Sequence, residues 1–468
     1  VSSSQRMAKE TCRATTESGS DRQVKTTRIH QAMLAIDRNV RFTLATAVFV
    51  IGLCLTVHSG DAAAAPGDLF PNASVPPGYR ATLWATNVKS PHQLIALACP
   101  QNDVLVLEGL LEGALPSSVG AVTVYYDNGN KNFSGSRERL ELARAPGLNH
   151  ALAVHRSFLY ASSDCVVYRW PYTPCTRTFL GAPTRVITNM PSLMHLTRSL
   201  IFDASNRLYV TIGARNNIDY SVTRSDIVRY VVYGATLPIS YLSGEVFAKG
   251  TRNTMGLAFD PQGTLWGVDS SNSPSFIRTD LRANPNENPL GELNRFDVQR
   301  PGLQYGYPYC FTASSQLNFS QIGLLPEFDN GYCRNRTFAN IPPALGFVAH
   351  SLPTDIRFYT SFHSQQRWGF PSSTVGSAFV AFAGLKGRKP VTGYRIVKVN
   401  FQSGWPISYE PFLWWSKSSN SSSAPHDGDG WNFRPYGLTL GAKGEFYASS
   451  NGGANDGKIV LVRYVGRR

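Results

Sequence analysis

The sequence predicts an all-β fold, specifically a six-bladed β-propeller. Its 468 residues are 42% hydrophobic, 12% aromatic and 16% charged, with 40 Gly and 29 Pro. This composition excludes an intrinsically disordered chain and a coiled coil. No amphipathic helical pattern of 10–15 residues alternates with the apolar runs, which argues against a βαβ sheet. What remains is a turn-rich chain built from strands.

A recurring phrase defines the elements of this fold: an alternating apolar strand, a tight turn and a second apolar strand. Its copies span His92–Gly109, Asn149–Ser163, Thr197–Gly213, Arg252–Ser270 and Arg434–Gly453, with a degenerate copy at His350–Tyr359. Six hairpins of this kind close into a ring when each begins a four-stranded blade. Two packed β-sandwiches are the alternative architecture, but they would not predict one recurring phrase.

The amino-terminal residues 1–65 are predicted to form a pre-sequence, and residues 66–468 the propeller domain. Phe42–Val57 carries no charge. This run is short for a membrane span of about 20 residues but suits the core of a signal peptide. We therefore expect a secreted, extracellular protein. An uncleaved signal anchor, with the propeller outside the membrane, is the alternative, and only then would the protein contact a membrane.

The cysteines and sequons agree with export. Five cysteines follow the pre-sequence. We expect Cys165 to pair with Cys175 and Cys310 with Cys333 across short loops, leaving Cys99 as a buried free thiol, although five cysteines allow other pairings. Five N-glycosylation sequons favour a surface that tolerates glycans; they begin at Asn72, Asn132, Asn318, Asn335 and Asn420.

The formal net charge of +14 points to anionic small molecules rather than to nucleic acid. Blocks of Lys and Arg, and basic helices interleaved with aromatic residues, are missing from the sequence, so nucleic acid is not an expected partner. A positive field of this kind attracts small anions in general.

The residues just before the first strand of each hairpin are expected to converge at one rim of the central channel. They supply imidazole, guanidinium and amide groups: His92, Asn149, His150, His195, Arg198, Arg252, Asn253, His350 and Arg434. Taken singly, such a residue is usually solvated or satisfies a turn. Several guanidinium groups in one pocket favour a ligand with several carboxylates. The set therefore predicts a site for a small polyanion.

In these positions the chain resembles the quinoprotein glucose/sorbosone dehydrogenases, six-bladed propellers that bind pyrroloquinoline quinone (PQQ) over the channel. His195–Asn217 carries the resemblance most clearly, followed by Gly250–Trp266. Further matching segments follow in the family's order: Glu292–Phe296 with Gln304–Cys310, Gly376–Val399 and Arg434–Leu440.

The resemblance implies roles for individual residues. His195 is similar to the general base that takes the anomeric hydroxyl proton while hydride leaves the sugar for the quinone. Arg252 and Asn253 resemble the pair that contacts the quinone oxygens, which makes Arg252 the second catalytic candidate. The other cofactor-binding candidates are Lys386 and Arg434 for the carboxylates, Asn149 or His150 as a polar contact, and Arg198, which matches an arginine of the first motif.

The chain departs from the family in the segment that helps to hold calcium on the quinone. Val268–Asn294 lacks the expected acidic, Gly-rich character, and Gly291 stands where an acidic residue is expected. Calcium can be bound largely by backbone carbonyls, so the candidate ligands are the carbonyls of Ser271 and Asn272.

The function implied by this resemblance is that of an exported PQQ-dependent dehydrogenase, which oxidises an aldose or related sugar aldehyde and passes electrons to an external acceptor. A secreted propeller that binds proteins or glycans without catalysis is the alternative, because fold alone does not decide function. Five retained residues favour the enzyme: His195, Arg252, Asn253, Lys386 and Arg434. The hydrolase motifs G-x-S-x-G and H-E-x-x-H are absent from the sequence.

Overall fold

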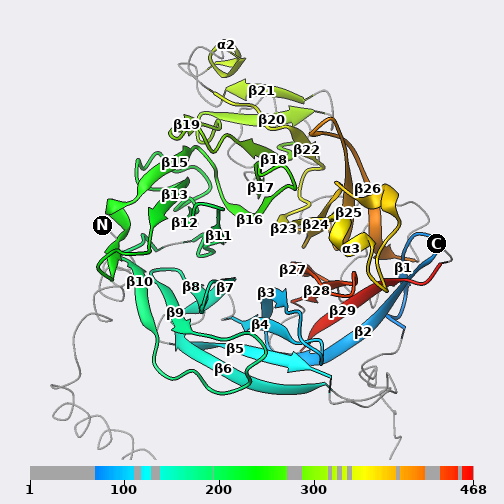
Figure 1. Cartoon of the computed structure of the whole chain (residues 1–468). Coiled ribbons are helices and arrows are strands. Elements are labelled where there is room, and N and C mark those ends of the chain that lie inside the picture. The colour runs from blue at the N-terminus through cyan, green and yellow to red at the C-terminus, as the bar shows by residue number, and fades with distance from the viewer. Residues whose placement is uncertain are drawn as a thin grey trace, which may run out of the picture. The chain divides into compact units, whose positions relative to one another are not determined.

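Six sheets are arranged as blades around a central axis (Figure 1), and one further sheet of two strands lies in an insertion. The computed structural model describes residues 69–109, 118–127, 137–192, 194–270, 287–314, 319–323, 329–334, 340–385, 391–416, 433–451 and 456–466. Within these residues the prediction of an all-β, six-bladed propeller is confirmed. No helix among them is long and apolar enough to cross a membrane.

The first three blades follow one another along the chain and run from the axis outward. Blade 1 contains β3 (Pro91–Ala96), β4 (Val104–Glu108), β5 (Val119–Tyr126) and β6 (Glu138–Pro146). Blade 2 contains β7 (Leu148–His155), β8 (Phe158–Ser163), β9 (Val167–Pro171), β10 (Thr184–Thr188) and the short parallel strand β14 (Ile239–Ser240). Blade 3 contains β11 (Leu200–Phe202), β12 (Arg207–Ile212), β13 (Asp226–Val231), β15 (Glu245–Lys249) and the short parallel strand β19 (Leu303–Gln304), with the 3₁₀ turn η2 (Tyr241–Ser243) before β15.

Blades 4 and 5 carry the larger insertions. Blade 4 contains β16 (Thr254–Phe259), β17 (Leu265–Asp269), β18 (Gly291–Phe296) and β22 (Leu345–Phe347), and between the last two lie the hairpin β20 (Cys310–Ser314)–β21 (Phe319–Gly323) and helix α2 (Asn330–Arg334). Blade 5 contains β23 (Pro353–Phe358), β24 (Ala378–Phe382), β25 (Arg395–Gln402), β26 (Trp405–Trp415) and β1 (Ala73–Ser74), with α3 (Ser361–Ser364) and η5 (Ser372–Thr374) between β23 and β24.

Blade 6 closes the ring with strands from both ends of the propeller sequence. It contains β27 (Pro435–Leu440), β28 (Phe446–Ser450), β29 (Gly457–Tyr464) and, outermost, β2 (Tyr79–Val88). The register of β2 and β29 runs antiparallel from Tyr79 opposite Tyr464 to Val88 opposite Gly457. The first strand of the ring thereby covers the edge that the last strand would otherwise expose.

Five of the predicted copies form the hairpin that begins a blade at the axis, whereas the degenerate copy His350–Tyr359 supplies only β23, and its partner β24 follows after α3 and η5. In several blades, a hydroxyl group on the second strand accepts a hydrogen bond from a backbone N–H within or just before the innermost strand. Ala151 N donates to Ser162 Oγ (3.0 Å), Ser199 N to Thr211 Oγ1 (2.9 Å) and Gly437 N to Ser449 Oγ (2.8 Å). Buried backbone donors need such partners, and this explains why polar residues occupy buried positions in otherwise apolar strands.

Aromatic and branched side chains fill the spaces between neighbouring blades. Trp84, Trp170 and Trp266 are fully buried. Between blades 5 and 6, Phe379 packs against Phe412 and Phe446 at centroid distances of 4.5 and 5.1 Å. Edge-to-face and tilted ring pairs of this kind stabilise a core beyond the area they bury.

The disulfide bonds correct part of the prediction. Cys310 bonds to Cys333, as expected. Cys175 bonds to Cys99 and not to Cys165, so the predictions of a Cys165–Cys175 loop and of a free Cys99 thiol are wrong. The physical reason is the blade arrangement, which brings the β3–β4 turn of blade 1 beside the loop that follows β9 of blade 2.

Candidate active site

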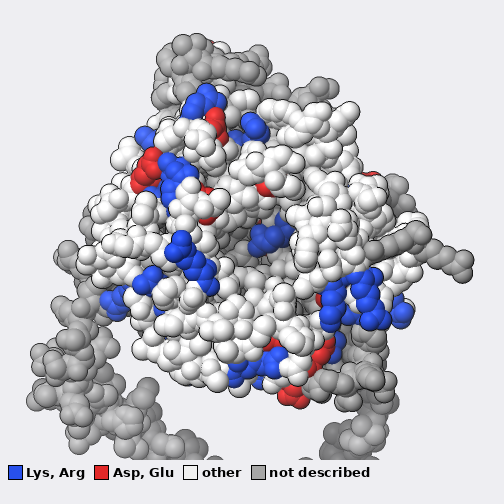
Figure 2. Space-filling model, in the orientation of Figure 1, with Lys and Arg blue, Asp and Glu red and all other residues white. Residues whose placement is uncertain are grey.

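A hollow opens at the axis of the ring, and Lys or Arg side chains are visible inside it (Figure 2). The residues predicted for the site come from the segments that precede the innermost strands.

The imidazole of His195 is half-buried and held in one orientation. Its Nδ1 donates to the carbonyl oxygen of Ala214 at 2.7 Å, which fixes the proton on Nδ1 and leaves the lone pair on Nε2. Burial, together with the neighbouring charges of Arg252 and Arg198, lowers the pKa of His195 to about 4. The ring is therefore a neutral proton acceptor at neutral pH.

Gly213 lets His195 and Asn253 approach one another. A Cβ atom at Gly213 would lie 2.6 Å from His195 Cβ and 2.7 Å from Asn253 Oδ1. Thr197 Oγ1 donates to the same Asn253 Oδ1 at 3.2 Å. The segment before β11 and the segment before β16 thus meet across this glycine, and the predicted convergence of His195 with Asn253 is observed.

Arg252 is held by the segment that follows β12. Its Nη2 donates to Asn217 Oδ1 at 2.9 Å, and its Nε donates to the Asn217 carbonyl at 3.3 Å. Nη1 reaches Ser270 Oγ at 3.3 Å. Burial lowers the pKa of Arg252, while Tyr307 and Asp269 act in the opposite direction. The guanidinium is fixed by neutral groups and keeps its positive charge in the site.

Two carboxyl groups lie behind Arg252 on adjacent strands. Asp269 on β17 pairs in register with Glu292 on β18. Burial, reinforced by Glu292, raises the pKa of Asp269 to about 7, and burial also raises the pKa of Glu292. Asn253 N donates to Asp269 Oδ1 at 2.6 Å, and Thr312 Oγ1 donates to Glu292 Oε1 at 2.7 Å.

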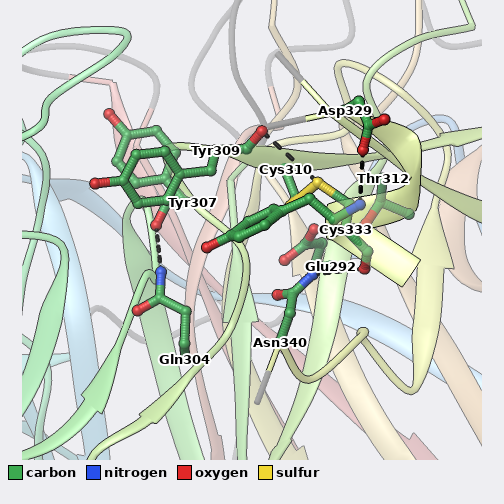
Figure 3. The surroundings of a disulfide bond; sticks show 10 residues. Glu292, Gln304, Tyr307, Tyr309, Cys310, Thr312, Asp329, Cys333 and Asn340 are labelled. Atoms are coloured by element: carbon green, nitrogen blue, oxygen red, sulfur yellow. Dashed lines mark hydrogen bonds between the residues drawn. A yellow bond between two sulfur atoms is a disulfide. The ribbon is translucent and has the colours of Figure 1, made fainter. Parts of the chain in front are cut away.

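The loop before β16 is hydrogen-bonded to the segment that leads to the Cys310–Cys333 disulfide. Tyr307 OH donates to the Asn217 carbonyl at 3.2 Å, and Tyr307 N donates to the carbonyl of Gly250. Figure 3 shows Tyr307 and Tyr309 in the segment that leads to the Cys310–Cys333 disulfide, with the Tyr307 carbonyl accepting from Gln304 Nε2 at 2.9 Å. The predicted disulfide therefore anchors the chain that positions Arg252.

Arg434 precedes β27 and spans toward blade 5. Its Nε and Nη2 donate to the carbonyls of Ala383 and Gly384 at 3.3 and 3.2 Å. The next residue of that segment, Leu385, donates its N–H to the carbonyl of His350. Lys386 follows directly, and this predicted residue lies outside the described part of the chain, as do Ser271 and Asn272.

Three buried polar atoms that have no hydrogen-bond partner among the described residues lie where blades 1 and 2 meet. They are Asn149 Oδ1, His92 Nδ1 and His150 Nδ1. A Cβ at Gly109 would touch both the His92 ring and the Asn149 backbone, so these two residues are neighbours. His150 lies in the core of the channel, where its Nε2 bonds to the Met255 carbonyl at 2.9 Å. Burial lowers the pKa of His92 to about 3 and of His150 to about 4, so both rings are neutral.

Arg198 is fully buried, and backbone carbonyls surround its guanidinium. Its nitrogens donate to the carbonyls of Asp164, Pro191, His195 and Thr197. This placement gives no support to the hypothesis that Arg198 contacts a cofactor.

Sequence reasoning missed several residues that shape the site: Ala214, Asn217, Asp269, Ser270 and Tyr307. Asn217 ends the motif that carried the resemblance, yet its amide reads as an ordinary turn residue. Only the fold shows that its side-chain oxygen accepts a hydrogen bond from Arg252.

Comparison with known proteins places the chain in a family. A family model described as TrAA12-like matches residues 73–465. The chain belongs to the TrAA12-like family. A PQQ-dependent sugar dehydrogenase of Hypocrea jecorina (strain QM6a) is 30% identical to this TrAA12-like chain over 264 residues, which are 50% of this chain and 60% of that relative. The match thus spans less than two thirds of the relative's length.

Solved structures share the fold of this TrAA12-like chain. The holo PQQ domain of pyranose dehydrogenase from Coprinopsis cinerea is 20% identical, with a TM-score of 0.68, over 85% of this chain and 99% of that one. An iodide structure of the Trichoderma reesei carbohydrate-active enzyme of family AA12 is 25% identical, with a TM-score of 0.66, over 85% and 98%. The resemblance to quinoprotein sugar dehydrogenases is confirmed.

Proposed function

We propose that this TrAA12-like protein is an exported PQQ-dependent dehydrogenase that oxidises an aldose, or a related sugar hemiacetal, and delivers electrons to an external acceptor. One observation carries the proposal: His195 and Asn253 approach each other across Gly213, beside the guanidinium of Arg252. The hydrogen bond to Ala214 occupies Nδ1 of His195, so the lone pair is on Nε2.

The residues fit the quinone cofactor. Its carboxylates and carbonyl oxygens need cationic and N–H donors, which Arg252 and Arg434 supply. Its ring N–H needs an acceptor, and Asn149 Oδ1 is a buried acceptor without a partner. His150 is already engaged with Met255, so Asn149 is the better of the two candidates for a polar contact.

Two protein groups have separate roles in sugar oxidation: His195 accepts a proton, and Arg252 supplies a positive charge. Bound PQQ would supply the acceptor for the hydride of the anomeric carbon, and the oxidised sugar would leave as a lactone. His195 Nε2 takes the proton of the anomeric hydroxyl, because Nδ1 is already committed to the Ala214 carbonyl. Arg252, fixed by Asn217 and Ser270, holds a positive charge where negative charge develops.

The deciding experiment is a titration of cofactor-free protein with PQQ and calcium, followed by a panel of aldoses with an artificial electron acceptor. We expect a quinone absorbance change on binding and acceptor reduction by at least one aldose. Omitting calcium, or chelating it, tests the proposal that the ion assists cofactor binding. Without quinone binding and acceptor reduction the enzyme proposal fails, and a propeller that only binds proteins or glycans takes its place.

His195→Gln tests the role of the imidazole. We expect turnover to fall by at least about 100-fold, in line with the loss of a general base, while the Kd for PQQ changes little. His155→Gln is the matched control, since His155 ends β7, whereas the predicted site residues Asn149 and His150 lie at its start, and the His155 ring bonds to Asn206. Lost PQQ binding with residual turnover would show that His195 contacts the cofactor instead.

Export is the second part of the proposal. The disulfide bonds Cys99–Cys175 and Cys310–Cys333 are typical of an oxidising compartment. Asn72, the one sequon asparagine among the described residues, is exposed. Expression in a secreting host, with mass spectrometry before and after glycan removal, should find glycosylated protein in the medium with an amino terminus near residue 66. Protein that is retained in cells without glycans would contradict export.

A further inference from the structure

Arg198 organises the segment that carries His195. Its Nη1 donates to the carbonyls of His195 and Thr197, both at 2.8 Å, and its Nη2 donates to the carbonyl of Pro191 at 2.6 Å. Nε donates to the carbonyl of Asp164 at 3.0 Å on blade 2. One buried side chain therefore ties three carbonyls of the segment before β11 to the neighbouring blade.

His195 is held at two points by these bonds. Its backbone carbonyl accepts from Arg198, and its ring donates to Ala214 from the other side. The preceding residue, Met194, has φ of +45° and is largely exposed. A non-glycine residue rarely adopts this conformation, which persists only when its surroundings enforce it.

The charge of Arg198 also reaches the imidazole. Arg198 is fully buried, and the hydrogen bonds it makes among the described residues go to backbone carbonyls rather than to carboxylates. The charged groups that act on His195 are Arg252 and Arg198, which lower its pKa, and Asp219, which raises it.

We propose that Arg198 is a positioning residue, which fixes the His195 imidazole through the carbonyls of Pro191, His195 and Thr197 and touches neither sugar nor cofactor. This inference rests on the proposed role of His195 as the base, and it replaces the expectation that Arg198 binds the cofactor.

Arg224 offers a matched control within the same segment. Its Nη1 and Nη2 donate to the carbonyls of Pro191 and Ser192 at 3.3 and 2.9 Å, but it bonds to neither His195 nor Thr197. Arg224→Gln removes a guanidinium from the segment without releasing the His195 carbonyl. Arg198→Gln removes the guanidinium that binds this carbonyl, and Arg198→Lys keeps the charge without the planar fork.

The first readout needs no activity. The His195 imidazole is titrated by NMR in the cofactor-free full-length chain, with its signal assigned by comparison with His195→Gln. We expect the His195 pKa to rise by about one unit in Arg198→Gln and by less in Arg198→Lys, and to stay unchanged in Arg224→Gln. An unchanged titration in both Arg198 variants would overturn the inference, whether or not the protein proves to be a dehydrogenase.

The second readout separates positioning from cofactor contact. For Arg198→Gln and Arg198→Lys we expect kcat to fall 10-fold or more, with the acid limb of the pH profile moved to higher pH and the Kd for PQQ within about threefold of the parent. A Kd for PQQ weakened 100-fold with an unshifted pH profile would show direct cofactor contact. If Arg198→Gln does not fold, Arg198→Lys with Arg224→Gln as control decides the same question.

Discussion

The buried carboxyl group of Asp269, near Arg252, makes the stability of the protein depend on pH. Asp269 is buried, and its pKa of about 7 lies well above the ordinary carboxyl value near 4 because burial and Glu292 disfavour its charge. Between these two values the folded protein holds a proton that the unfolded chain has lost. The free energy of unfolding therefore falls as pH rises from about 4 to about 7, and this loss is complete above the folded pKa.

Asp269→Asn should remove this dependence. The amide keeps an oxygen that can accept from Asn253 N, but it carries no charge. We expect the variant to show a flatter Tm between pH 5 and 8, and to be more stable than the parent at pH 8 by about 1 kcal/mol or more, since one unit of pKa shift corresponds to about 1.4 kcal/mol. Parallel Tm profiles for the two proteins would show that Asp269 does not carry the effect.

The sequence predicted which of the candidate residues lie near one another better than it predicted the directions of their side chains. His195, Arg252 and Asn253 were found because each precedes an innermost strand, and the fold brings them together. Arg198 precedes the same strand as His195. Its side chain is buried instead against the carbonyls of Pro191 and His195, because buried carbonyls need hydrogen-bond donors. Which of two neighbouring polar residues turns toward the axis depends on such local backbone demands.

At the scale of elements, alternation and turn residues were enough to find five innermost hairpins, and in blade 5 they found only the first strand, β23, because α3 and η5 separate it from β24. The two-residue strands β1, β14 and β19 have no pattern of their own and exist only because a neighbouring edge offers hydrogen bonds. The Cys99–Cys175 pairing was missed for a related reason, since it joins neighbouring blades rather than one local loop. Contacts within a hairpin can be predicted from sequence, whereas contacts between blades depend on how the ring packs.

The close approach of two inner-strand segments leads to a prediction for Gly213. Gly213→Ala places a methyl group 2.6 Å from His195 Cβ and 2.7 Å from Asn253 Oδ1, so the two segments must separate. We expect kcat/KM to fall about 10- to 100-fold, because small displacements of reacting groups are costly, while the circular dichroism spectrum stays that of the parent.

Gly291→Ala is the control for this substitution. Gly291 lies on β18 of blade 4, and its added Cβ would meet its neighbours at 3.4 Å or more, which is ordinary contact. Its activity should remain within about twofold of the parent. Equal activities for the two alanine variants would show that the spacing across Gly213 is unimportant.

At the scale of the whole molecule, stability depends on closing the ring. β2 contributes Leu83, Trp84, Ala85 and Val88 to the core, and Trp84 packs on Tyr447 of β28 at a centroid distance of 5.3 Å. Without β2, the edge of β29 and these contacts of blade 6 with blade 1 would be exposed. An open strand edge next to exposed apolar surface favours aggregation.

Two truncations test ring closure and the proposed domain boundary together. A chain that starts at Pro66 keeps β1 and β2 and should unfold cooperatively, with PQQ binding equal to that of the full chain. A chain that starts at Lys89 lacks both strands and should be insoluble or lack a cooperative transition in calorimetry, because the ring has lost the strand that pairs with β29 from Tyr79 to Val88. A soluble chain from Lys89 with the parent's Tm would show that five complete blades and a three-stranded sixth suffice. Failure of the chain from Pro66 alone would instead move the domain boundary toward the amino terminus.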